Sequence, residues 1–195
     1  VERFALFFGR VERYKGIDVL LRSQSQRSGS RPELPGLRYV LESGEGGTYC
    51  PRLIIAGRGQ LAKVWDGPLP SGVEVRNRYI DDDEGIDLFR RCGVVVLPYT
   101  QATQSALIAA AYVFGKPVIV TETGALAEYV VPGETGWVVP PKDPAALAAA
   151  LDEALADPAE CQRRGEKGRA WYERERVAEW ETLQAMYERV AGVGC

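Results

Sequence analysis

Short apolar runs alternate with helical patterns along most of this 195-residue chain. The continuous runs lie at residues 4–8, 53–56, 94–97, 118–120 and 137–139, and Val73-Glu74-Val75 begins a further predicted strand. Continuous apolar runs of this kind are typical of strands that are buried on both faces, as in a parallel sheet covered by helices. The alternation therefore predicts a doubly wound, Rossmann-like α/β domain whose ligand lies at the carboxyl ends of the strands.

Two stretches depart from that alternation. Residues 23–49 are rich in Ser, Gly, Pro, Arg and Glu, a composition that favours a surface insertion. Residues 157–195 are charged and aromatic, which predicts one or two amphipathic helices packing on the domain. We therefore expect the Rossmann-like domain to cover residues 1–156, followed by a C-terminal helical segment at 157–195.

Composition narrows the chemistry that the chain can perform. The sequence has no histidine, which excludes a Ser-His-Asp triad and any histidine-ligated metal site within it. The net charge of -3 argues against a nucleic-acid partner. The four cysteines are scattered without a C-x-x-C pair, which favours buried thiols in the reducing cytoplasm over a zinc site.

The loop after the first apolar run carries the clearest candidate chemistry. Gly9 ends the run, and Arg10 and Lys15 lie between it and the next helical pattern. Free amides and helix N-termini meet at this edge of an α/β sheet, and two cations beside them can bind a diphosphate. The alternative is that both side chains are solvated loop cations.

Two later junctions between a strand and a helix fall on the same edge. Thr103 or Ser105 can cap the following helix and leave its first amides for a phosphate, although such capping by itself implies no ligand. Glu122 or Glu128 can accept hydrogen bonds from sugar hydroxyls, and we favour a structural role for Glu128.

Several motifs in order resemble a known family. In chain order they are Phe-Phe-Gly-Arg-x4-Lys-Gly, Leu-Ile-Ile-Ala-Gly-x-Gly, Val-Leu-Pro-Tyr, Gly-Lys-Pro-Val-Ile-Val-Thr-x-Thr-Gly and Gly-Glu-Thr-Gly-Trp-Val-Val-Pro-Pro. Together they resemble the C-terminal, donor-binding half of a GT-B glycosyltransferase of family 4, a group of retaining enzymes that use nucleotide sugars. The resemblance covers nearly the whole chain outside residues 23–49.

The resemblance implies a donor site without a metal. Arg10 and Lys15 match the family's basic pair, which contacts the donor diphosphate and stabilises its charge. Gly9 matches the glycine that lets this loop approach the diphosphate. Because the cations and the helix amides neutralise the charge, the family usually needs no bound metal or other cofactor.

The resemblance also assigns contacts to the rest of the donor. Tyr79 and Ile80 fall where the family's loop meets the nucleobase. Ser105, Ala106 and Leu107 match a helix start whose amides approach the phosphates and the ribose.

The chain departs from the family at one motif. Family members commonly carry two glutamates spaced E-x7-E, and these positions are Ala102 and Ala110 here. In an active branch of the family, Gln104 or Ser105 replaces a carboxylate contact. The alternative is a non-catalytic scaffold domain with a degenerate donor site, and a nucleotide-sugar epimerase is a remoter one.

GT-B enzymes bind the acceptor in an N-terminal domain, and the resemblance covers only their C-terminal half. The resemblance therefore implies a fragment, or one subunit of a split enzyme, that binds a nucleotide or nucleotide sugar weakly and transfers no sugar alone. The complete enzyme is expected to transfer a hexosyl group to a glycan, a lipid or another acceptor. Any membrane contact, at the inner membrane face, is expected from the absent half.

Overall fold

Six parallel strands form a single sheet in the order β3-β2-β1-β4-β5-β6. The computed structural model describes residues 4–29 and 52–192. Its strands are β1 (Phe4–Phe8), β2 (Arg52–Ala56), β3 (Val73–Arg76), β4 (Val94–Leu97), β5 (Val118–Thr121) and β6 (Gly136–Val139). The predicted doubly wound α/β fold is confirmed. The strand order reverses between β1 and β4, and doubly wound folds typically bind ligands beside the loops that follow the two strands at such a switch point.

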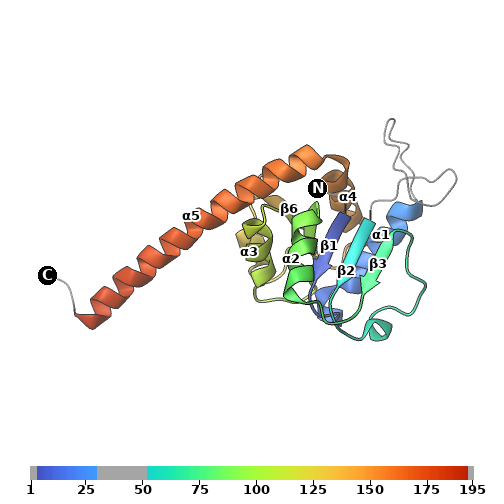
Figure 1. Ribbon diagram of the computed structural model, residues 1–195, viewed down its shortest axis with the longest axis horizontal. Helices are drawn as coiled ribbons and strands as arrows, with labels where there is room; N and C mark the ends of the chain where they lie inside the picture. Colours follow the sequence, from blue (N-terminus) through green and yellow to red (C-terminus); the bar gives the residue numbers. More distant parts are fainter. Residues whose placement is uncertain (1–3, 30–51, 193–195) are drawn as a thin grey trace.

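Helices cover both faces of this sheet (Figure 1). They are α1 (Ile17–Gly29), α2 (Asp82–Arg91), α3 (Ala106–Val113), α4 (Pro144–Ala156) and α5 (Pro158–Ala191), with 3-10 turns η1 (Arg13–Lys15), η2 (Leu61–Lys63) and η3 (Leu126–Tyr129). Helices α1 and α4 contact each other on one face. On the other face, Phe89 of α2 stacks on Phe114 at the end of α3, with ring centroids 5.4 Å apart.

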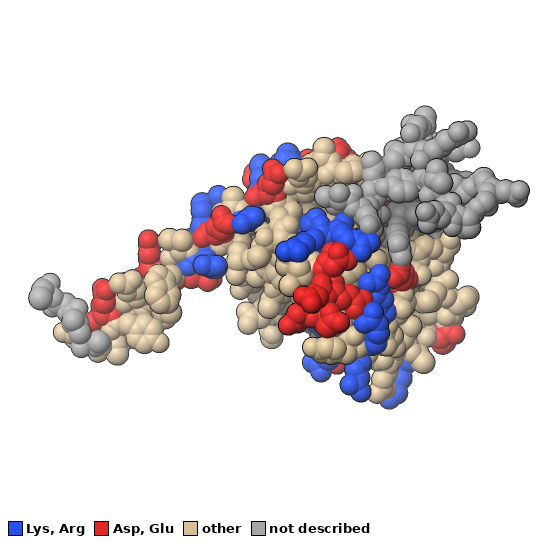
Figure 2. Space-filling view, in the orientation of Figure 1, with Lys and Arg blue, Asp and Glu red and all other residues tan. Residues whose placement is uncertain are grey.

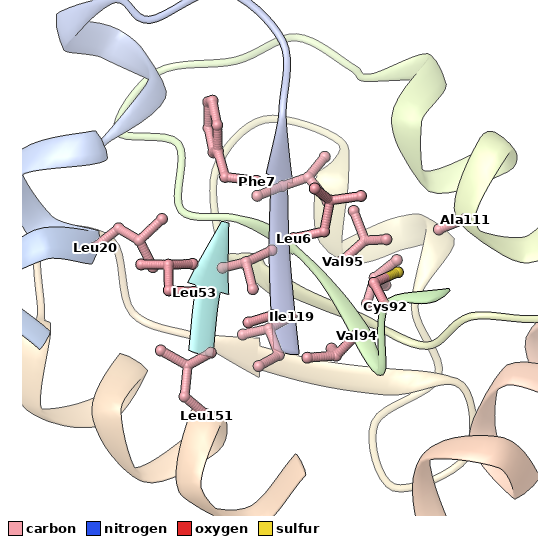
Figure 3. Packing of buried hydrophobic residues seen from close by; sticks show 14 of the residues in the cluster. Leu6, Phe7, Leu20, Leu53, Cys92, Val94, Val95, Ala111, Ile119 and Leu151 are labelled. Atoms are coloured by element: carbon pink, nitrogen blue, oxygen red, sulfur yellow. The ribbon is translucent and has the colours of Figure 1, made fainter. Parts of the chain in front are cut away.

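The core is continuous through the sheet because the central strands are apolar on both faces. Leu6, Val95 and Ile119 are fully buried. Figure 3 shows Leu20 and Leu151 on one side of these strands and Ala111 on the other. Full burial of strand side chains on both faces is what a helix-covered parallel sheet requires.

Helix α1 corrects the expected start of the surface insertion. The helix continues to Gly29, so residues 23–29 are helical, and Ser23, Gln24 and Arg27 are buried. These polar side chains are tolerated there because they have partners: Arg27 donates to Asp152 of α4 at 2.6 Å and to Gln24 at 2.8 Å. The remainder of the expected insertion, residues 30–49, lies outside the described residues.

One long helix occupies the C-terminal segment. Asp157 caps it by accepting hydrogen bonds from the N–H groups of Ala159 and Glu160. Its first half packs closely on the domain: a Cβ on Gly165 would lie 1.9 Å from the Gly115 carbonyl oxygen, and one on Gly168 would lie 2.4 Å from the Tyr112 ring.

The second half of α5 corrects the expectation that the whole segment packs on the domain. Every side chain from Glu173 to Val190 is exposed, and this part of the helix projects away from the sheet (Figure 1). The sequence pattern of the segment is amphipathic, but among the described residues nothing covers its apolar positions. No helix in the described part of the chain is both long and apolar enough to cross a membrane.

Candidate functional site

The loops after β1 and β2 are joined at the carboxyl edge of the sheet. The Gly9 N–H donates to the Ala56 carbonyl oxygen at 2.9 Å, and the Val11 N–H donates to that of Arg58 at 3.1 Å. Gly57 has a φ of 142°, and a Cβ there would lie 2.0 Å from the Gly9 oxygen. The glycine therefore permits a close approach that any side chain would prevent.

The loop after β1 is also fixed to the loop after β4. The Tyr14 carbonyl oxygen accepts hydrogen bonds from the Thr100 N–H at 2.8 Å and the Thr100 Oγ1 at 3.2 Å. Next to it, Gly16 packs on the Pro98 carbonyl group. These contacts fix the loop that carries Lys15 at the edge of the sheet where the strand order reverses.

Lys15 lies above an aromatic ring. Its Nζ is 3.8 Å from the centroid of the Tyr99 ring and 5.4 Å from that of the Tyr14 ring. The side chain is half-buried, and among the described residues no carboxylate lies within ion-pair distance of it. The ammonium group is therefore held in place while its charge is not cancelled.

Arg10 has a different environment. Its side chain is 75% exposed and pairs with Glu12 at 3.2 Å. The structure therefore places the two predicted cations on the same loop and gives only Lys15 a fixed position. An exposed ion pair contributes at most about 1 kcal/mol, so a doubly charged ligand can displace Glu12.

The start of α3 lies beside the β1 loop. Ser105 caps the helix, since its Oγ accepts a hydrogen bond from the Leu107 N–H at 3.4 Å. The Leu107 side chain lies 3.8 Å from where a Cβ on Gly9 would be. Ala106 is exposed, and its N–H makes no hydrogen bond within the described residues. With no acidic residue in the first turn, the positive end of the helix dipole is open to an anion.

The loop after β3 presents a free aromatic ring. Tyr79 is 75% exposed, whereas the side chain of Ile80 is buried in the core, which leaves only its backbone for a ligand. Arg78 donates to both carboxylate oxygens of Glu84, at 2.7 and 2.8 Å, and these hydrogen bonds lower the pKa of Glu84. Figure 2 shows the acidic start of α2 between groups of basic side chains. Sequence reasoning missed this pairing.

No carboxylate occupies the two positions that the family motif gives to glutamate. Ala110 lies half-buried on α3, and the carbonyl oxygen of Ala102 would lie 2.0 Å from a Cβ on Gly124. Gln104, Glu122 and Glu128 are exposed.

The sequence did not predict the contact between Tyr99 and Lys15, which are far apart in the chain. Tyr99 is buried, its ring lies under Lys15, and its hydroxyl lies 3.5 Å from the Ser105 Oγ. The Val-Leu-Pro-Tyr motif was the available signal, but nothing in it indicates which side chain the ring contacts. The site thus combines an unneutralised cation with an open helix start, which together suit a phosphorylated ligand. The exposed Tyr79 ring lies on the loop after β3, two strands away from β1 in the sheet.

Comparison with known proteins gives the family. The family described as Glycosyl transferases group 1 matches residues 2–157. A D-inositol 3-phosphate glycosyltransferase of Streptomyces avermitilis is 32% identical over 165 residues, which cover 82% of this chain and 34% of the relative.

Solved structures share the fold. Sucrose-phosphate synthase of Thermosynechococcus elongatus superposes with a TM-score of 0.71 at 24% identity, over 99% of this chain and 46% of that chain. Anabaena HepE, solved in complex with UDP-glucose, superposes with a TM-score of 0.67 at 17% identity, over 94% of this chain and 49% of that chain. The chain thus spans about a third of the curated relative and about half of each structure. It belongs to the group 1 glycosyltransferase family.

Proposed function

We propose that this domain binds the nucleotide-sugar donor of a retaining glycosyltransferase, which transfers a hexosyl group to a glycan, a lipid or another acceptor. The observation that carries the proposal is the Lys15 ammonium, which lies over Tyr99 beside the start of α3 with no carboxylate partner among the described residues. The complex of Anabaena HepE with UDP-glucose supports it, because HepE shares the fold.

The chemistry expected of this site is electrostatic. When the bond between the sugar and the diphosphate breaks, negative charge develops on the departing phosphate oxygens. Lys15 and the Ala106 N–H would stabilise that charge, and Arg10 would join them once it leaves Glu12. These groups do the work of a metal ion, so we expect none to be needed.

Exposed side chains would supply the remaining contacts with the donor. The exposed Tyr79 ring would stack on the nucleobase, with the Ile80 backbone next to it in the chain. Gln104, exposed just before the Ser105 cap, would bond to sugar hydroxyls in place of the glutamates that Ala102 and Ala110 do not supply. Hydrogen bonds from neutral groups are weaker than those of carboxylates and still orient a ligand.

The acceptor side would be a second domain of similar size, since the chain covers only 34–49% of the relatives described above. The projecting half of α5 offers the surface for it. Large apolar side chains there are exposed: Val177, Trp180, Leu183, Met186, Tyr187 and Val190. Exposed apolar patches of this kind mark interaction surfaces. We propose that this stripe packs on the acceptor-binding domain.

The two buried free thiols, Cys92 and Cys161, fit a reducing, cytoplasmic setting for the protein.

Calorimetric titration of the domain with UDP, GDP and ADP tests the proposal. At least one of the three should bind, and Lys15→Met, which keeps the aliphatic stem, should weaken that binding by about tenfold or more. Lys167→Met is the matched control, because Lys167 lies on α5 and pairs with Glu134 at 3.3 Å. Binding of none of the three would favour the alternative, a non-catalytic scaffold domain.

A further inference from the structure

We infer that Tyr99 is a positioning residue for the donor: its ring holds the Lys15 ammonium and its hydroxyl supports the Ser105 cap, so that both groups reach one diphosphate. The inference rests on the proposed function and adds a residue to which neither the family resemblance nor the comparisons give a role. Three sets of contacts carry it.

Tyr99 itself is held firmly. It lies two residues after the end of β4 and is 1% exposed. Its carbonyl oxygen accepts hydrogen bonds from the hydroxyl groups of Thr121 and Thr123, which belong to the end of β5 and the loop after it. The ring is therefore fixed relative to the central strands before any ligand arrives.

The ring then fixes the cation. The β1 loop reaches it through the hydrogen bonds between Tyr14 and Thr100 and through the packing of Gly16 on Pro98. At 3.8 Å from the ring centroid, the Lys15 ammonium is within the range of a cation–π contact. A carboxylate at this place would also hold the lysine, but it would cancel the charge that a diphosphate needs. An aromatic face restrains the cation and leaves its charge available.

The hydroxyl extends the arrangement to the helix. It lies 3.5 Å from the Ser105 Oγ, which accepts from the Leu107 N–H at 3.4 Å. One side chain thus joins the cation of the β1 loop to the cap of α3. The distance between the hydroxyl groups is long, so we expect the ring to matter more than the hydroxyl.

Tyr112 is a buried tyrosine with a structural role, and it differs from Tyr99 in having, within the described part of the chain, no cation over its ring. It is also fully buried, and its hydroxyl donates to the Tyr129 carbonyl oxygen and lies within hydrogen-bond distance of the Thr135 hydroxyl, both at 2.9 Å. Burial raises the pKa of Tyr112 to about 12, although the hydrogen bond with Thr135 lowers it in part. No lysine or arginine among the described residues lies over its ring. Tyr112→Phe is therefore the matched control for Tyr99→Phe.

A double-mutant cycle with the nucleotide that binds tightest tests the inference. Tyr99→Leu should weaken binding by about fivefold to twentyfold, the size of a partly desolvated cation–π contact, and Tyr99→Phe by no more than about threefold. In the Lys15→Met background, Tyr99→Leu should weaken binding by no more than about threefold, the share of the hydroxyl, because the ring then has no cation to position. Tyr112→Phe should lower the melting temperature and leave the dissociation constant unchanged.

Additive losses in the cycle would overturn the inference while leaving the proposed donor site intact, whereas a wild-type domain that binds no nucleotide would overturn both. A measurement without ligand guards against misfolding of Tyr99→Leu. In the NMR spectrum of the wild-type domain, the Lys15 ε-methylene should be shifted upfield by the Tyr99 ring, and the shift should persist in Tyr99→Phe. A Lys15 resonance at its ordinary position in both proteins would overturn the inference.

Discussion

Gly16 lies against the carbonyl group of Pro98 so closely that a Cβ on Gly16 would be 1.8 Å from the Pro98 oxygen. The glycine also has a φ of 67°, in the left-handed region that L side chains rarely adopt. This contact lets the loop after β1 reach the loop after β4, and Lys15 is the residue immediately before it. The position of the cation therefore depends on a backbone contact that only glycine permits.

Replacing that glycine should be costly. Gly16→Ala combines left-handed strain with a clash against backbone, and we expect it to lower the free energy of unfolding by about 3 kcal/mol. Gly133→Ala is the control, because Gly133 has a φ of 78° and no atom within 4 Å of its would-be Cβ. It should lose only about 1 kcal/mol. Urea denaturation measures both, and equal losses would show that the contact with Pro98 is unimportant.

Releasing Arg10 should strengthen nucleotide binding. Glu12→Gln removes the partner that holds the Arg10 guanidinium at 3.2 Å, and we expect the affinity for the preferred nucleoside diphosphate to rise about twofold. Glu134→Gln breaks a comparable exposed pair with Lys167, away from the site, and should leave the dissociation constant as it is. Calorimetric titration of both variants is the measurement. Weaker binding by Glu12→Gln would mean that Glu12 supports the site.

Two tryptophans of α5 should behave differently. The Trp171 ring lies edge-on to those of Tyr112 and Tyr129, at 6.1 and 6.3 Å, so Trp171→Ala should lower the free energy of unfolding by about 3 kcal/mol. Trp180 is 66% exposed, and Trp180→Ala should change the free energy of unfolding by no more than about 0.5 kcal/mol. Denaturation of the isolated domain makes the comparison. A large loss for Trp180→Ala would show that the projecting half contributes to the stability of this domain.

Acid should weaken the ion pairs in the first turns of α5. Hydrogen bonds from Arg163, and then from Arg164, lower the pKa of Glu160 from 4.5 to about 2. The stabilisation from this carboxylate is therefore fully present above pH 4.5 and is lost as the pH falls towards 2. Glu160→Gln should be less stable than the wild type at neutral pH, and the two melting temperatures should converge as the pH falls through that range. A difference that stays constant with pH would contradict the assignment.

The central sheet was predictable because the local sequence of each central strand indicates that the strand is buried on both faces. Residues such as Leu6 and Val95 lie in runs that are apolar at every position, and only burial on both faces explains such runs. The Ser105 cap was predictable for the same reason, since a cap is a local device that depends on the first turn of its own helix.

Features that depend on distant partners were not predictable. Arg27 and Gln24 resemble loop residues by composition, and they are buried in a helix only because Asp152 of α4 accepts from Arg27. The contact of Lys15 with Tyr99 joins residues from two loops that the fold, and not the sequence, brings together. The sequence pattern of α5 likewise marks an apolar stripe without showing what covers it.

Because Gly165 and Gly168 pack closely on the domain, the first half of α5 is held rigidly and fixes the direction of the projecting second half. From Glu173 onward the helix rises about 1.5 Å per residue, so its arm reaches about 27 Å beyond the domain. A tilt of about 10° at the base would swing the tip of such an arm by about 5 Å. The packing at Gly165 and Gly168 would consequently set the position of any partner that binds near Trp180 and Tyr187, although these residues are far from the two glycines.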